Sequence, residues 1–582
     1  SQLSDMATRA VLLLLFAPCL VAIQPSDTWY GNHGGPYYPA FWNFSPAGVS
    51  IYSVEGDLMK SIPNTEICQT RTSGGKTTND CKYYRVTSDG RKNVYATLTG
   101  DSSFSAVQAF SMETGMHVGD LETCGFPYNI EYAPHREEIW THCWSPDEGE
   151  DSRDREGHPG DEGHLDVFST NAIGLDHEQI QLNPVAVRGH GHVQLDAALP
   201  NHAYATALTG SNHIGKPGWF KIPLNKGKHA KQAVPLNFDW KMCPGGFYRF
   251  ALNGYNKHAY LRCMVCCSCG VDGDTGDACK TGTVNITTGE GCGRNCAPGS
   301  VNITTGPNAG TYQPGHCGHT CENSKADTVG MVEYDLVTET VVGTHEPTHE
   351  TNKGNSAPLV SSRGDYVVMM GGTGAYTDIL KTNGNGQLAV NAGSIATGFK
   401  DGGGQSITDC EFVEDDTHNI AIFAATTDNF VVLADMRATA AWDGEGTPPA
   451  IPSRKIFLHT LSSSDVDEDY KTNAESSSGH GRGAVRSIVW APGTNKVLIN
   501  SGKTKELHLI TLSADGGIEG AALTKTIAGA ESRYMVYVDN HEASANRAAI
   551  ADAVRVAKAE VLQEVAAELE AAKKSTMKLT FI

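Results

Sequence analysis

A unit of three strands recurs along the chain from residue 84 onward. A short apolar stretch is followed by a polar turn, a second β-rich stretch, a polar loop and a third apolar stretch. The clearest copies are 84–98 with 106–110, 130–140 with 165–168, and 193–205 with 219–223. Apolar and polar residues alternate with period two inside these stretches, which predicts strands of sheets buried on one or both faces.

The repeated units predict a ring of small sheets. Their first strands begin near residues 84, 128, 193, 247, 358, 407 and 485. Such spacing suits four-stranded propeller blades, for which ~40–50 residues are typical, apart from the wider gap after 247 that holds a Cys-rich block. An eighth first strand, 534–538, has no strands after it, whereas 40–44, 49–53 and 58–62 lack a first strand. We therefore expect an all-β propeller over 40–540, with eight blades favoured over seven, closed by pairing of the N- and C-terminal strands.

Two short phrases carry a resemblance to a known superfamily. The stretches Ser88–Tyr95 and Ser362–Val368 join a polar turn to a β-rich strand. They resemble turns of the YVTN and WD40-like propellers, including lactonase-like proteins, although no Y-V-T-N tetrapeptide occurs. The resemblance implies the fold and leaves the activity open, because propellers serve many unrelated functions.

Both ends of the chain differ from the repeats. Residues 10–21 form an apolar run behind Arg9, too short to span a bilayer as a helix, so we expect residues 1–22 to contain a signal peptide. Residues 545–574 place apolar side chains at steps of three or four, which predicts an amphipathic helix. That helix either packs on the flank of the propeller or mediates oligomerisation.

Composition and sequons agree with export. The 582 residues carry a net charge of −21 and show no basic stripe, which argues against nucleic-acid partners. No later stretch is apolar enough for a transmembrane helix. Three N-x-S/T sequons place possible glycans on Asn43, Asn285 and Asn302, the last two in a duplicated phrase. We expect a secreted or cell-surface glycoprotein.

Cysteine usage indicates disulfides. Of the 16 cysteines, Cys19 falls in the signal peptide, which leaves an odd number and so one thiol that is free or pairs between chains. Cys68 and Cys81 flank a polar loop and predict one bridge, while Cys410 in an apolar run predicts a buried thiol. Residues 264–325 are expected to form a glycosylated insertion held together by disulfides, with a zinc site at 316–321 as the alternative. The cysteines expected to form disulfides in this insertion or directly before it are Cys263, Cys266, Cys267, Cys269, Cys279, Cys292, Cys296, Cys317 and Cys321.

Histidines cluster where the strand order predicts a common rim. A Gly-His-Gly core immediately precedes two first strands, at 188–192 and 478–482. Neutral imidazole is a usual ligand of divalent transition metals, so a Cu or Zn site is one interpretation. Its ligands would be His190, His192 and His480 with His142 or His213. Hydrogen-bonded or solvated histidines are the alternative.

One acidic segment belongs to the same predicted rim. Residues 146–163 contain eight carboxylates that could hold Ca²⁺, but they lack the D-x-D-x-D-G spacing, so a solvated charge run is favoured. No G-x-S-x-G, Walker or H-E-x-x-H motif is present.

Three functions fit the sequence. The first is a binding module whose decorated loop face recognises a protein, glycan, small molecule or ion. The second is a metal-dependent enzyme, hydrolytic in the lactonase manner or oxidative. The third is a structural extracellular component joined to its neighbours through the odd cysteine.

Overall fold

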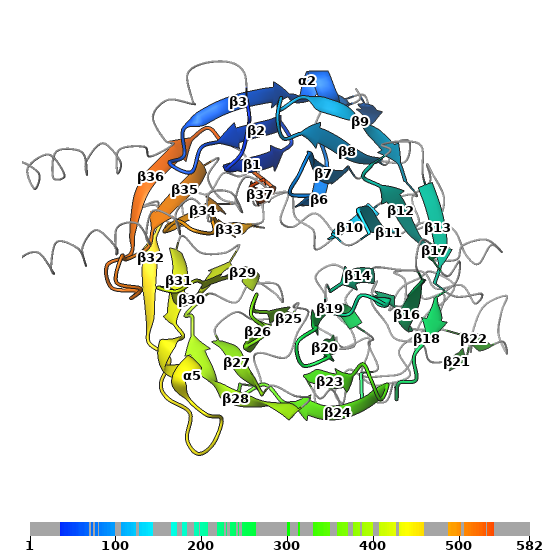
Figure 1. Cartoon of the computed structure of the whole chain (residues 1–582), viewed down its shortest axis with the longest axis vertical. Coiled ribbons are helices and arrows are strands. Elements are labelled where there is room, and N and C mark those ends of the chain that lie inside the picture. The colour runs from blue at the N-terminus through cyan, green and yellow to red at the C-terminus, as the bar shows by residue number, and fades with distance from the viewer. Residues whose placement is uncertain are drawn as a thin grey trace, which may run out of the picture.

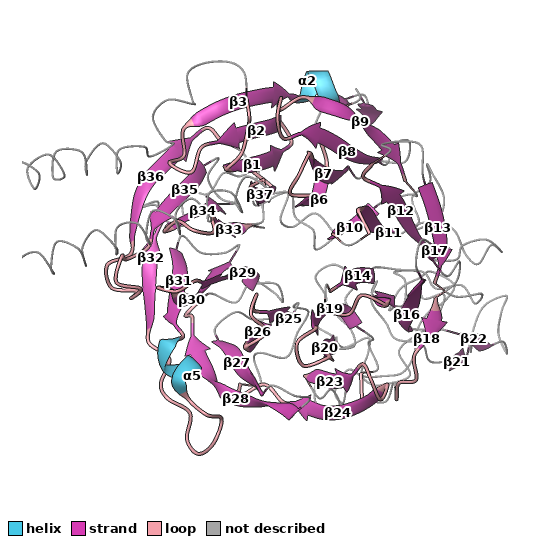
Figure 2. Cartoon of the chain, in the orientation of Figure 1, coloured by secondary structure: helices cyan, strands magenta, loops and turns pink. Residues whose placement is uncertain are grey.

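Eight four-stranded sheets stand around a central opening in the computed structural model (Figure 1). It describes residues 35–540 with gaps, the longest being 144–163, 264–299, 315–329 and 459–486. The expected signal peptide and the expected helix over 545–574 lie outside the described residues. The prediction of an all-β propeller is confirmed, with eight blades, and helices are confined to two short segments among the described residues (Figure 2).

Each blade is built outward from an inner strand beside the central opening. Blade 1 contains β37 (Tyr534–Val538), β1 (Ala40–Ser45), β2 (Gly48–Tyr52) and β3 (Leu58–Pro63). Blade 2 contains β6 (Tyr83–Ser88), β7 (Asn93–Leu98), β8 (Ala106–Ser111) and β9 (His117–Glu122). Blade 3 contains β10 (Pro127–Ala133), β11 (Glu138–Cys143), β12 (His164–Ser169) and β13 (His177–Gln181). Blade 4 contains β14 (Gly191–Leu195), β15 (His202–Ala207), β16 (Gly218–Asn225) and β17 (Lys228–His229), with β18 (Val234–Pro235) also paired to β16.

The second half of the ring follows the same order. Blade 5 contains β19 (Phe247–Asn253), β20 (His258–Cys263), β23 (Met331–Asp335) and β24 (Thr340–His345). Blade 6 contains β25 (Pro358–Val360), β26 (Tyr366–Met370), β27 (Tyr376–Asn383) and β28 (Gln387–Ala396). Blade 7 contains β29 (Ile407–Glu414), β30 (Asn419–Ala425), β31 (Phe430–Asp435) and β32 (Ser453–Phe457). Blade 8 contains β33 (Ile488–Trp490), β34 (Lys496–Ser501), β35 (Glu506–Thr511) and β36 (Ala522–Ala528).

A few elements lie outside the blades. The short helices are α2 (Asn64–Ile67) and α5 (Arg437–Ala441). Two small hairpins are formed by β4 (Arg71–Ser73) with β5 (Lys76–Thr78), and by β21 (Ser300–Asn302) with β22 (Tyr312–Pro314).

Blade 1 combines both ends of the described chain. Its innermost strand, β37, pairs antiparallel with β1, with Trp42 opposite Val536 and Phe44 opposite Tyr534. The strand bounds are close to those expected from the sequence. Strand β37 thus supplies the inner strand that the three N-terminal strands lack, and the blade that they form lies between blades 8 and 2 in Figure 1.

Eight apolar clusters hold the ring together, one between each pair of neighbouring blades. Strand β1 shows why the sequence looks nearly continuous in apolar residues: Trp42 and Phe44 pack toward blade 2, whereas Phe41 packs toward blade 8. A strand sandwiched between two blades must be apolar on both faces. The smallest cluster lies between blades 5 and 6.

Side chains of the inner strands satisfy backbone groups of the next blade. The Asn129 amide donates to the Val193 carbonyl at 3.2 Å and accepts from its N–H at 3.1 Å. Gln194 Oε1 accepts from the Leu252 N–H at 2.9 Å, and Ser487 Oγ accepts from the Met535 N–H at 3.0 Å. These contacts occupy backbone groups on the inner edges, where no further strand is available.

The two ends of the strands define two faces of the ring. On what we call the loop face, the inner strand of each blade begins, the second strand ends and the third strand begins. On what we call the turn face, the inner strand ends, the second strand begins and the third strand ends. Short connections between an outer strand and the next inner strand, such as 123–126 and 529–533, keep this direction constant around the ring. The chain therefore returns to the loop face once in every blade and again between blades.

Candidate functional site: the loop face

Most connections on the turn face are short, internally bonded turns, and the longest of them, residues 436–452 between β31 and β32, contains α5. Asp89 Oδ1 accepts hydrogen bonds from the N–H groups of Arg91, Lys92 and Asn93, which fixes the turn between β6 and β7. Turns of neighbouring blades are also joined: the Asp196 carboxylate accepts from the Gly254 N–H at 2.9 Å. Similar contacts join Asn253 to the Gly364 carbonyl and His418 to the Ser513 carbonyl.

The loop face carries the long connections. Residues 144–163 lie between β11 and β12, 208–217 between β15 and β16, and 264–330 between β20 and β23. Residues 458–487 connect blade 7 to blade 8. The acidic segment and the Cys-rich block thus each interrupt a blade between its second and third strands. The acidic segment itself, and with it the Ca²⁺ hypothesis, lies outside the described residues.

Two of the five expected histidine ligands are described, and their side chains lie on opposite faces of β14. His142 is buried near the end of β11, and an ideal Cβ on Gly191 would lie 2.0 Å from its Nε2. Gly191 begins β14, so His142 of blade 3 packs beside the residue that precedes His192 of blade 4. Only glycine leaves room for that imidazole. His190, His213 and His480 lie outside the described residues.

No group of three or more His, Cys, Asp or Glu side chains is arranged to hold a metal ion among the residues that the structure describes. His192 instead makes an edge contact with Phe250, with ring centroids 5.9 Å apart. A metal at this rim would therefore depend on histidines from the segments that are not described.

Two disulfides lie on the loop face. Cys68 and Cys81 are bonded, with Cα atoms 5.6 Å apart, as the sequence predicted. Cys263 was expected to form a disulfide with an unassigned partner, and it is bonded to Cys243, with Cα atoms 5.0 Å apart. Cys243 precedes β19 and Cys263 ends β20, so both reach the loop face of blade 5. The strand order alone could have suggested this pair.

The insertion in blade 5 has a narrow, rigid base. The Cys263 N–H donates to the Gly330 carbonyl at 3.0 Å, and Arg262 is paired with Met331 across β20 and β23. The chain therefore leaves the blade after Cys263 and returns beside it. With Cys263 bonded outside the insertion, an even set of cysteines remains within 264–329: Cys266, Cys267, Cys269, Cys279, Cys292, Cys296, Cys317 and Cys321.

Cys410 is the free cysteine of the described residues, and it is buried in blade 7 as expected. Burial raises the pKa of its thiol, and the neighbouring Asp409 and Glu411 raise it further. A buried, protonated thiol is poorly suited to bond another chain. The expectation of intermolecular linkage through an odd cysteine therefore loses its support.

The structure shows how accessible one of the three sequons, Asn43, is. Asn43 is 1% exposed in the middle of β1, between β37 and β2, where an attached glycan has no room in the folded blade. The expectation of a glycan on Asn43 is therefore not compatible with the fold. Asn302 ends β21, and Asn285 lies outside the described residues.

Acidic side chains on two inner strands form a feature that the sequence analysis did not single out. Glu131 lies on β10 and Glu411 lies on β29. These two inner strands stand beside the central opening (Figure 1). Asp409 accepts a hydrogen bond from the Ile488 N–H at 2.8 Å, and Glu411 accepts one from the Trp490 N–H. Asp409 and Glu411 thus join β29 to β33. A signal was available, since charged residues interrupt otherwise apolar inner strands.

Burial raises the pKa of the Glu131 and Glu411 carboxyls. Desolvation raises the pKa of Glu411 to about 8, with a further contribution from the Asp409 charge. Desolvation likewise raises the pKa of Glu131 to about 8, against an opposing effect of Arg85. Both carboxyls therefore favour their neutral form at pH 7.

We expect Glu411→Gln to remove part of the pH dependence of stability. The pKa of this carboxyl rises from about 4.5 in the unfolded chain to about 8 in the folded chain. Its contribution to the free energy of unfolding is therefore complete below pH 4.5 and is lost as the pH rises from 4.5 through 8. Glutamine mimics the protonated form. The variant should gain roughly 1–2 kcal/mol relative to wild type at pH 9 and little at pH 5, measured by urea unfolding. Glu122→Gln on the outer strand β9 is the control, and parallel profiles for both variants would contradict the expectation.

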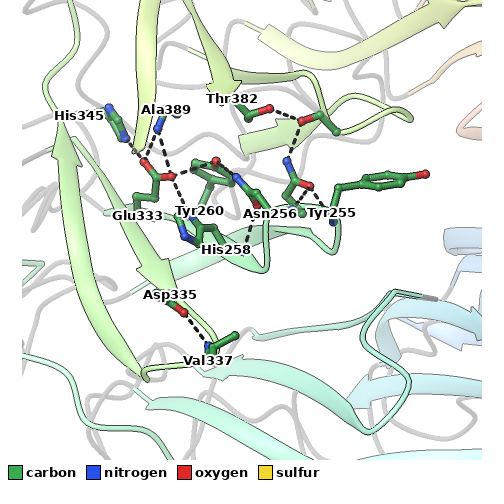
Figure 3. A network of polar contacts seen from close by, with 12 residues as sticks. Tyr255, Asn256, His258, Tyr260, Glu333, Asp335, Val337, His345, Thr382 and Ala389 are labelled. Atoms are coloured by element: carbon green, nitrogen blue, oxygen red, sulfur yellow. Dashed lines mark hydrogen bonds and ion pairs between the residues drawn. The ribbon is translucent and has the colours of Figure 1, made fainter. Parts of the chain in front are cut away.

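A second feature missed by the sequence analysis lies between blades 5 and 6 (Figure 3). The fully buried Glu333 accepts hydrogen bonds from His258 Nδ1 at 2.6 Å and His345 Nε2 at 2.8 Å. The Tyr260 hydroxyl donates to it at 3.2 Å, and the Ala389 N–H of blade 6 donates at 3.0 Å. This network occupies the interface that has the smallest apolar cluster.

The network holds Glu333 ionised. Burial would raise the pKa of this carboxyl, but hydrogen bonds from His258 and His345 and from the Ala389 N–H lower it to about 2. Arg262 is buried in the same blade, and desolvation lowers its pKa to about 10 while Asp378 of blade 6 favours its charge. The carboxylate of Glu333 is thus bound mainly by side chains of its own blade, whereas Arg262 interacts with Asp378 across the two blades.

Comparisons with known proteins find distant similarity to solved structures. No family model and no curated protein matches the chain. The periplasmic gluconolactonase PpgL of Pseudomonas aeruginosa is similar at 12% identity and a TM-score of 0.40, over 77% of this chain and 99% of that chain. AztD from Citrobacter koseri is similar at 11% identity and 0.43, over 85% and 96%. The dihydro-heme d1 dehydrogenase NirN is similar at 8% and 0.47, over 88% and 77%.

At these identities and TM-scores the three structures assign no activity to this chain. Among the described residues, no helix has the length and apolar character needed to cross a bilayer.

Proposed function

We propose that the chain is an exported propeller that binds its ligand on the loop face. The observation that carries this proposal is the difference between the faces: the longest connections open on one side, whereas short bonded turns close most of the other. Loops on a rigid scaffold are the usual place for binding residues, because they vary without cost to the core. The ligand would be a protein, a glycan or a small molecule.

Two further observations support export and presentation at this face. Both described disulfides lie on the loop face, and disulfides persist in oxidising compartments such as the periplasm or the extracellular space. The Cys243–Cys263 bond fixes the base of the largest insertion to the connection before β19. An insertion fixed in this way loses less conformational entropy when it binds.

The base of the insertion provides a direct test. Because the Cys263 N–H contacts the Gly330 carbonyl, residues 264–329 can be replaced by a short Gly-Ser linker without breaking β20 or β23. Labelled wild-type protein would be screened on arrays of glycans and of extracellular proteins. The excised variant should melt within a few degrees of wild type and lose at least about tenfold in affinity for the selected ligand.

A turn-face variant is the matched control for this screen. Tyr255→Ala with Val337→Ser removes two exposed side chains of the same blade, at 71% and 68% exposure, on the opposite face. This variant should bind like wild type. Retained binding after excision together with lost binding in the turn-face variant would refute the proposal.

A metal-dependent activity is the second proposal for the same face. Its support is that His142, near the end of β11, and His192, near the start of β14, both lie at the loop-face ends of their strands in neighbouring blades. His190, His192 and His480, with His142 or His213, would supply nitrogen ligands to Cu or Zn. Metal analysis of the purified protein and of the His192→Ala, His480→Ala double variant tests it, since no metal in either protein would refute it.

A further inference from the structure

Exposed apolar side chains gather on the turn face of blades 1 and 2. Leu58 begins β3 and is 60% exposed, Met116 ends the turn before β9 and is 53% exposed, and Val118 of β9 is 48% exposed. Lys60 Nζ of blade 1 contacts the Thr114 carbonyl of blade 2 at 2.7 Å and Met116 Sδ at 3.2 Å. The two blades are therefore joined at this point. We call Leu58, Met116 and Val118 the apolar rim.

Both ends of the described chain reach the turn face beside this rim. The Tyr37 N–H donates to the Met112 carbonyl at 2.8 Å, which places the start of the chain at the turn between β8 and β9. At the other end, the Asn540 amide donates to the Arg91 carbonyl at 3.2 Å, on the turn between β6 and β7. The sequence after Asn540 therefore begins on blade 2, on the same face as the rim.

The sequence after Asn540 has an apolar face that needs a partner. Ile550, Val554, Ala557, Val561, Val565 and Leu569 recur at helical spacing. An amphipathic helix of this length is marginal in water unless its apolar stripe packs against another surface. Residues 541–549 reach roughly 30 Å when extended, whereas the four strands of a blade span about 15 Å. The segment is long enough to reach the outer strands of blades 1 and 2.

We propose that the apolar stripe of residues 545–574 docks on the apolar rim of blades 1 and 2. Docking would cover three exposed apolar side chains at the same place where the chain leaves the ring. It would also leave the loop face open. This inference is independent of the binding function proposed above, because it concerns the opposite face.

Cysteine labelling measures the docking directly. A Met116→Cys variant would be folded and then treated with a bulky maleimide, in the full chain and in a chain that ends at Asn540. The thiol should react at least about tenfold more slowly in the full chain, which corresponds to about 1.4 kcal/mol of docking free energy. Tyr255→Cys, on the turn face of blade 5, should react equally fast in both chains.

Charge substitutions in the segment provide a second measurement. Val554→Glu with Val561→Glu puts charges on the apolar stripe and should raise the Met116→Cys rate of the full chain to that of the shortened chain. Ala559→Glu with Gln563→Glu adds the same charges on the opposite side of the helix and should leave the rate slow. Unchanged melting temperatures would show that the ring is intact in all variants.

Three results would overturn the proposal. Equal labelling rates in the full and shortened chains would show that the segment does not cover the rim. Protection that appears only as protein concentration rises would assign the rim to a second copy of the chain. Protection that is lost on removal of residues before Gly35, and kept on removal of residues after Asn540, would assign it to the N-terminal segment.

Discussion

Replacing Glu333 with alanine should cost about 3–5 kcal/mol of unfolding free energy at pH 7, the largest effect that we expect from one substitution outside the apolar core. The change removes the acceptor of His258, His345, Tyr260 and the Ala389 N–H, and all of these donors lie in or beside the interface of blades 5 and 6. Buried donors that lose their acceptor keep the full cost of desolvation. Urea unfolding of the purified variant measures the loss.

The pH dependence of this loss distinguishes the charge from simple packing. The pKa of Glu333 is about 2 in the folded chain and about 4.5 when unfolded, so its contribution is complete above pH 4.5 and falls as pH drops toward 2. The difference between wild type and Glu333→Ala should therefore narrow by about 1 kcal/mol between pH 6 and pH 3.5. Glu178→Ala on the exposed part of β13 should change stability by less than about 0.5 kcal/mol. A pH-independent difference would contradict this explanation.

Replacing Gly191 with alanine should cost about 2–4 kcal/mol. The added Cβ would lie 2.0 Å from His142 Nε2 and 2.1 Å from the Thr206 carbonyl oxygen. The imidazole can move, but the carbonyl belongs to β15 and is held by the sheet. The His142→Ala, Gly191→Ala double variant should therefore recover only part of the loss.

Gly119→Ala is the matched control for this experiment. Gly119 also lies in a strand, but an added Cβ would meet nothing within 4 Å. Its replacement should be neutral, or slightly stabilising through reduced entropy of the unfolded chain. Thermal melting of the three variants and wild type decides the comparison. Similar melting temperatures for Gly191→Ala and Gly119→Ala would show that His142 does not pack against β14.

The fold could be predicted from sequence because each blade is encoded locally. Alternating strands and polar turns repeat within short stretches, and the lone strand at 534–538 together with three strands near the N-terminus implied a shared blade. Those stretches correspond to β37, β1, β2 and β3. The Cys68–Cys81 bond was predictable for the same reason, since its two residues lie close in sequence.

The features that were missed depend on which strands become neighbours in the fold. His258, Glu333 and His345 lie on three strands of one blade, and nothing local to each indicates that all three turn toward blade 6. The Cys243–Cys263 bond required knowing that a residue before an inner strand meets the end of the second strand. Asn43 shows the opposite error, because a sequon motif says nothing about burial between two strands.

Amide hydrogen exchange of β37 is the most direct test of the closed ring on which the loop-face assignment depends. The ring has a complete blade between blades 8 and 2 only if residues 534–538 form the inner strand of blade 1. We predict that a peptide covering these residues exchanges about a thousandfold more slowly than an unstructured chain, and as slowly as one covering β1. Exchange of residues 534–538 at the rate of an unstructured tail, with β1 still protected, would contradict the closed ring.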